Sequence, residues 1–293
     1  MFWLRKPAPA SVAVAPADSI APAELPVALD SEMFRRHFDA LLAGAEQDGG
    51  IDGYLSALAA KRDVFAAAQP AGLEEITRLL ALVFTARRKL YPALETLGGN
   101  ALDGLIRDLR QGKNPPGERL QQFVDAMPGA AGNDRVSLKA AAKLRRAAWD
   151  FAAEILHFTD CERYPLMTHW VWDQATQSGA LREFIRGGET MREVPFSNDP
   201  GVFEGARRWL AGQLAEQGIY RDEALWIDLV QAQAYLAYFR SMTEGSLGAD
   251  FGRGVPPQEQ LKRLLGIDAE PGMRHDRVKK PGSAQSTTEK TVH

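Results

Sequence analysis

The stretch from Trp149 to Asp173 concentrates the residues of this chain that could do chemistry. It holds three of the six tryptophans, two of the five histidines and the only cysteine. Large aromatic and ionisable side chains gathered in one short segment are typical of a pocket. They are also typical of a core corner whose indole N–H groups reach carboxylates such as Asp173, and this is the interpretation that we favour. The candidate pocket residues are His157, Cys161, Arg163, His169, Trp170 and Trp172.

Glu154 and His157 have the Glu-x-x-His spacing of a metal site. On a helix this spacing places both side chains on one face, within reach of one metal ion. Ferritin-like di-iron proteins use the pair twice, with further glutamates from two other helices. The sequence has no second pair, because Leu166 stands three residues before His169. We therefore expect no cofactor, and keep a metal-dependent enzyme that uses Glu154 and His157 as an alternative.

Cys161 is flanked by Asp160 and Glu162. Two neighbouring carboxylates disfavour a thiolate, which argues against a nucleophilic role for this cysteine. A single cysteine also excludes an internal disulfide. A reducing, cytoplasmic location is therefore the simplest expectation.

A second candidate site is a basic stripe on the long helix predicted over residues 137–158. Four cations lie on its first half, close to Trp149, and such a stripe can contact nucleic acid. The alternative is a solvated helix face anchored by aromatic residues. The residues of the stripe are Lys139, Lys143, Arg145 and Arg146.

The elements that must position these residues are predicted to be helices throughout. Apolar residues recur at helical spacing in about ten segments, and no run alternates as a strand would. Among these segments we expect helices over 73–91, 137–158, 165–177 and 222–242. The fold class is therefore all-α.

We expect one helical domain over residues 31–268, with a possible division into two subdomains near 127–135 or 187–199. Residues 1–30 are rich in Ala and Pro, and residues 269–293 are polar and basic. Such compositions cannot bury a core, so both ends are expected to be disordered.

Composition narrows the function classes. The net charge of −3 gives no overall field that would draw the chain onto nucleic acid or an anionic membrane. No run approaches the roughly 18 apolar residues of a membrane span. The leading expectation is a soluble accessory protein that presents helical surfaces to a protein partner. A nucleic-acid-binding protein is the first alternative.

Residues 154–173 carry a local resemblance. Tyr164-Pro165 followed by Thr168-His169 resembles the stretch of helix-hairpin-helix DNA glycosylases in which an Asp-Thr-His-Val-type motif opens a helix. The position of that family's catalytic Asp is Met167 here, and its catalytic Lys has no counterpart. The resemblance implies a helical scaffold that has lost this active site but retains contact with DNA.

Overall fold

The computed structural model describes residues 20–69, 72–243 and 255–268, and in these ranges the chain is all-α, as predicted. They contain ten α-helices, one 3-10 helix and two isolated β-bridges, but no strand. None of these helices combines the length and low polarity needed to cross a bilayer. The elements are α1 (Ser31–Glu46), α2 (Ile51–Ala67), α3 (Gly72–Ala81), α4 (Tyr91–Leu97), α5 (Gly99–Gln111), α6 (Pro116–Asp125), α7 (Arg135–Thr159), η1 (Ala180–Phe184), α8 (Pro200–Glu216), α9 (Glu223–Thr243) and α10 (Pro257–Leu264).

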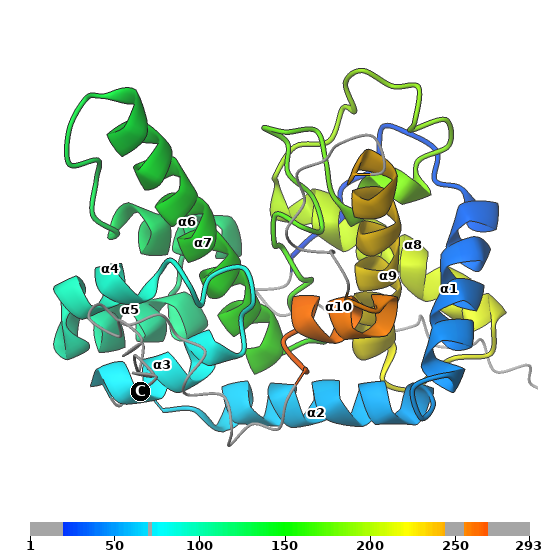
Figure 1. Cartoon of the computed structure of the whole chain (residues 1–293), viewed down its shortest axis with the longest axis horizontal. Helices are drawn as coiled ribbons and strands as arrows, with labels where there is room; N and C mark the ends of the chain where they lie inside the picture. Colours follow the sequence, from blue (N-terminus) through cyan, green and yellow to red (C-terminus); the bar gives the residue numbers. More distant parts are fainter. Residues whose placement is uncertain (1–19, 70–71, 244–254, 269–293) are drawn as a thin grey trace, which may run out of the picture.

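The helices form two lobes that share α2 and α7 (Figure 1). One lobe contains α3 to α6 and the first half of α7. The other contains α1, η1, α8, α9 and α10, with α9 packed against α1, η1 and α8. Helix α2 runs beneath the second lobe, where it contacts α1 and α9, and α7 packs on it. The chain thus starts in one lobe, builds the other, and returns through α7.

Helix α7 changes character along its length. It begins at Arg135 because the Asp134 carboxylate accepts hydrogen bonds from the backbone N–H groups of Val136 (2.9 Å) and Ser137 (3.0 Å). None of residues 135–146 is buried, whereas residues 147–158 are all buried except Trp149. The first half therefore presents side chains to solvent, and the second half belongs to the core.

The helix predicted over 73–91 is wrong in its second half. Helix α3 ends at Ala81, and a series of turns leads to α4 at Tyr91. Leu82 and Val83 donate their backbone N–H groups to carbonyls three residues earlier, which tightens the chain and ends the α-helix. The apolar run was real, but it is buried in turns rather than on a helix face.

The helix predicted over 165–177 does not form. This segment is a succession of turns with a β-bridge between Asp173 and Ser178. Carboxylates take the backbone N–H groups that a helix would need: Asp150 accepts from His169, and Asp173 accepts from Ala175. Acidic side chains that bond to nearby backbone compete with helix formation.

The boundary predicted for the N-terminal arm also needs correction. Residues 20–30 pack on the rest of the chain, and only 1–19 of the predicted arm lie outside the described residues, as do 269–293. The backbone N–H of Ala23 donates to the carbonyl of Gly201 (2.8 Å), and that of Asp30 to the carbonyl of Phe184 (2.8 Å). Leu29 forms the other isolated bridge, with Ile185.

Candidate functional site

Three buried ionisable side chains follow one face of α7: Asp150, Glu154 and His157. Their spacing of four and three residues confirms the shared face predicted for Glu154 and His157. Each of the three is at most 3% exposed, and each has its partner on a different part of the chain. Asp150 contacts His169, Glu154 contacts Lys61, and His157 contacts Asp228.

Glu154 joins three helices in the core. Its Oε2 lies 2.6 Å from the Nζ of Lys61 on α2, and this ammonium also donates to the carbonyl of Leu265 (2.7 Å), just after α10. The same ammonium lies 4.3 Å from the ring centre of Phe158. Burial raises the pKa of Glu154 to about 7, although Lys61 lowers it. The pair is a structural cross-link that holds α2, α7 and the end of α10 together.

His157 is held at both ring nitrogens. Its Nδ1 donates to the carbonyl of Tyr164 (2.7 Å), which can only accept, and its Nε2 lies 2.9 Å from Oδ2 of Asp228. Burial lowers the pKa of His157, but Asp228 and Cys161 raise it more strongly, so it lies well above its ordinary value. Because Nδ1 donates to a carbonyl and Nε2 faces a carboxylate, His157 has no free lone pair for a metal ion.

Glu154 and His157 therefore share a helix face but not a metal site. Within the described ranges, no group of three or more His, Cys, Asp or Glu side chains is arranged to hold a metal ion. The spacing predicted the face correctly. It could not predict the partners, since Lys61 is 93 residues from Glu154 and Asp228 is 71 residues from His157.

The predicted tryptophans belong to the core. Trp170 and Trp172 are 3% and 1% exposed. The indole N–H of Trp172 donates to the carbonyl of Phe196 (3.3 Å) rather than to a carboxylate such as Asp173, which corrects that expectation. Cys161 is also buried, and the guanidinium of Arg163 lies 5.2 Å from the centre of the Tyr164 ring. These four residues do not converge on one pocket.

A different set of predicted residues does converge. Helices α6 and α7 and the turns after α7 enclose a depression of about 670 Å³, which we call the basic groove. It brings the whole predicted basic stripe together with His169, which the sequence placed in a separate cluster. The lining residues are Gln121, Val124, Lys139, Ala142, Lys143, Arg145, Arg146, Trp149, His169, Asp173, Ala175 and Asn198.

Two of the four cations in the basic groove are already neutralised. Arg145 pairs with Asp125 (2.5 Å), and Arg146 pairs with the buried carboxylate of Asp173. Lys139 and Lys143 are exposed and make no ion pair with any residue in the described ranges. These two lysines are one helical turn apart, so the groove keeps two unpaired positive charges on one wall.

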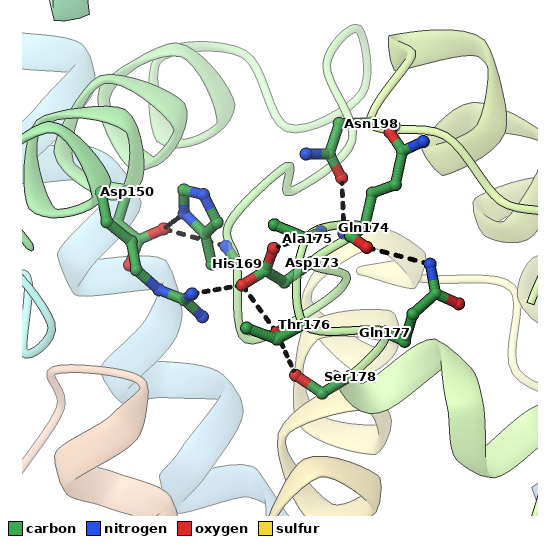
Figure 2. A network of polar contacts seen from close by, with 10 residues as sticks. Asp150, His169, Asp173, Gln174, Ala175, Thr176, Gln177, Ser178 and Asn198 are labelled. Atoms are coloured by element: carbon green, nitrogen blue, oxygen red, sulfur yellow. Dashed lines mark hydrogen bonds and ion pairs between the residues drawn. The ribbon is translucent and has the colours of Figure 1, made fainter. Parts of the chain in front are cut away.

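Hydrogen bonds fix a second part of the groove, around Trp149 and His169 (Figure 2). Oδ1 of Asp150 accepts from both the backbone N–H (2.9 Å) and the Nδ1 (2.7 Å) of His169. The indole N–H of Trp149 donates to the carbonyl of Met167 (2.7 Å), and its ring centre lies 6.1 Å from that of His169. The two aromatic rings are therefore held side by side in the groove.

The turn beyond His169 is equally constrained. Oδ1 of Asp173 accepts the backbone N–H of Ala175 (3.0 Å), and its Oδ2 accepts the hydroxyl of Thr176 (2.8 Å). Oδ1 of Asn198 accepts the backbone N–H of Gln174 (3.1 Å). Since its oxygen is used in this way, Asn198 keeps its NH₂ group for other acceptors. These hydrogen bonds fix the conformation of the turn.

The sequence did not identify Asp150 or Asn198 as residues of the candidate site. Asp150 carried one signal, because it stands one helical turn after Arg146 on the predicted long helix. Asn198 comes from a segment 24 residues beyond Gln174, and nothing local to it indicates a site.

No family model, curated protein or solved structure matches this chain.

Proposed function

We propose that the protein is an accessory nucleic-acid-binding protein that holds a phosphate backbone in the basic groove. The observation that carries the proposal is the pair of unpaired lysines, Lys139 and Lys143, facing a groove that also contains Trp149 and His169. A cationic wall that tracks the backbone beside aromatic rings that contact bases is the usual arrangement for binding nucleic-acid strands.

Two further points favour a nucleic acid over an acidic protein. The Cβ atoms of residues four apart on a helix are about 5–6 Å apart, a spacing similar to that of successive phosphates along one strand. In addition, the segment whose sequence resembles helix-hairpin-helix DNA glycosylases supplies His169 and Asp173 to the groove wall, although it forms turns here rather than the helix that this motif opens in that family. The resemblance, which is one of sequence alone, implies contact with DNA.

The proposal gives Glu154 and His157 a structural role, since each is already paired in the core. It includes a cytoplasmic location, which the unpaired Cys161 supports because single thiols are common in reducing compartments.

The experiment is fluorescence anisotropy with labelled single-stranded and duplex oligonucleotides over a range of salt concentrations. We expect affinity to fall steeply with salt. Lys139→Ala with Lys143→Ala should weaken binding and reduce the slope of log K against log salt by about 2, roughly one for each phosphate that a lysine no longer neutralises.

The matched control is Lys89→Ala with Lys113→Ala, which removes the same charge from two exposed positions outside the groove. It should leave both affinity and slope unchanged. An absence of binding to every oligonucleotide at low salt would overturn the proposal and favour an acidic protein partner. Equal loss of binding in the control would show that the groove is not the site.

A further inference from the structure

Asp150 and His169 form a pair with the geometry of an acid–base site. The carboxylate can only accept hydrogen bonds, so the ring proton of neutral His169 sits on Nδ1 and the lone pair on Nε2. The side chain of Asp150 is 5% exposed and that of His169 is 17% exposed. The orienting carboxylate is thus buried, while the imidazole borders the basic groove, and its Nε2 has no partner within the described ranges.

The second hydrogen bond makes the pair rigid. Oδ1 of Asp150 also accepts the backbone N–H of His169, so the carboxylate fixes both the ring and the turn that carries it. A buried carboxylate on Nδ1 sets the tautomer of a catalytic histidine and stabilises the imidazolium after it takes a proton.

The groove offers a base and cations but no hydroxyl or thiol nucleophile. No Ser, Thr or Cys is among its lining residues, and no metal-binding cluster is present in the described ranges. The nucleophile must therefore be water or a group that the substrate carries. RNA carries one, because its 2′-hydroxyl lies next to the phosphodiester, and this attack needs no water molecule positioned by the protein. Lys139 and Lys143, the two groove cations without an ion pair, can stabilise charge that develops on the phosphoryl oxygens.

We propose that the basic groove cleaves single-stranded RNA, with His169 as the general base. This rests on the proposed function, since the strand must first bind there. Nε2 of His169 takes the proton of a 2′-hydroxyl, and the 2′-oxygen attacks the adjacent phosphorus. As this bond forms, the bond from phosphorus to the 5′-oxygen breaks. The leaving oxygen takes a proton from water, and the hydroxide that remains neutralises the imidazolium.

This reaction predicts defined products and a defined substrate range. One product ends in a 2′,3′-cyclic phosphate and the other begins with a 5′-hydroxyl. Nothing is oxidised or reduced, and no metal ion is consumed. DNA and 2′-O-methyl RNA should bind in the groove but remain intact, because neither can supply the nucleophile.

The test uses the full-length protein with labelled single-stranded RNA in the presence of EDTA. We expect the unaltered protein to cut the strand and mass spectrometry to find the cyclic phosphate. His169→Gln, purified in parallel, should cut at least ~100-fold more slowly, since a general base contributes about 10²–10⁴-fold. Its affinity for 2′-O-methyl RNA should fall by far less than its cleavage rate, because Lys139 and Lys143 still hold the backbone, and this remaining binding also reports a folded groove.

The outcomes separate the two proposals. Binding without cleavage would overturn the RNA-cleaving inference and leave nucleic-acid binding intact. A failure to bind any strand would overturn both. Equal cleavage by His169→Gln would identify a contaminating nuclease, and cleavage abolished by EDTA would identify a metal-dependent one; either result would overturn the role of His169.

Discussion

Lys61 and Glu154 place opposite charges in the core, so removing one of them leaves the other buried and unpaired. Lys61→Met should lower the free energy of unfolding by about 3–5 kcal/mol at pH 8, because without Lys61 the Glu154 carboxyl group must either stay charged in the core or take up a proton. Lys61→Met combined with Glu154→Leu should recover most of this loss, because a buried ion pair replaced by apolar groups is often nearly neutral.

Urea unfolding of the two variants measures this difference. Equal destabilisation by the single and double variants would show that packing of the lysine stem, rather than the unpaired charge, dominates. The hydrogen bond from Lys61 to the carbonyl of Leu265 is removed in both variants, so it does not affect the comparison.

The pKa of Glu154 predicts how the stability of the protein depends on pH. In the folded protein the pKa of Glu154 is about 7, above its ordinary value of 4.5, because burial disfavours the charged form. The folded state therefore binds this proton more tightly than the unfolded state does. The stabilisation that results is fully present below pH 4.5 and is lost as pH rises to about 7. The change is on the order of 3 kcal/mol. His157, whose pKa is also raised, acts in the same direction above pH 6.5.

Urea unfolding between pH 4.5 and 7 should show stability falling in the unaltered protein, and a flatter profile in Glu154→Gln. A rise in stability over this range in the unaltered protein would contradict the assignment. Glu154→Gln keeps a polar partner for Lys61 but cannot titrate, which makes it the matched control.

At the residue scale, spacing along the chain predicted which side chains lie together on one helix. It placed Glu154 and His157 on one face and four cations on another stretch of the same helix. It could not show that the basic stripe and His169 line one groove, because the turns after α7 bring them together. Nor could it show which candidates are already paired, since their partners are distant in the sequence.

At the scale of elements, the end of α10 depends on a glycine. Gly266 has a φ of +69°, and a Cβ added there would overlap the carbonyl of Leu82 in the turn after α3. Gly266→Ala should therefore lower the free energy of unfolding by about 2 kcal/mol or more, from backbone strain together with the clash.

Gly212 provides the opposite case. It is exposed within α8, and a Cβ added there would meet nothing within 4 Å. Gly212→Ala should raise the free energy of unfolding by roughly 0.5–1 kcal/mol, since alanine loses less conformational entropy in a helix. Thermal unfolding of both variants tests the pair, and two shifts of the same sign would contradict it.

Two segments of the chain show when a local sequence pattern predicts a helix correctly and when it does not. Helix α7 has a capping aspartate and a long apolar stripe, and it formed as predicted to within two residues at its start. The segment 165–177 has apolar residues at compatible spacing, yet carboxylates on α7 and in the turn itself capture its backbone N–H groups. One of these acceptors is 19 residues away from the N–H it binds, so a local pattern could not include it.

At the scale of the whole molecule, the two lobes are interdependent. Residues 147–158 of α7 are buried in part through contacts outside residues 72–159, such as those with α2. A fragment of residues 72–159 would expose this apolar surface to water. We expect it to show little cooperative unfolding by circular dichroism, whereas the full chain should unfold in one transition. A fragment with a sharp transition of its own would contradict this expectation.

The change from exposed to buried along α7 also has a consequence for amide hydrogen exchange. Backbone N–H groups in the first half can open by fraying from the solvated end, while those in the second half exchange only when the core itself opens. One helix should therefore show a steep gradient of protection, with its step near Ala147. The basic groove lies beside the exposed first half of α7, before that step. A bound strand would therefore slow exchange in the first half and leave the buried half unchanged. The exchange pattern of α7 would then show whether the groove is occupied.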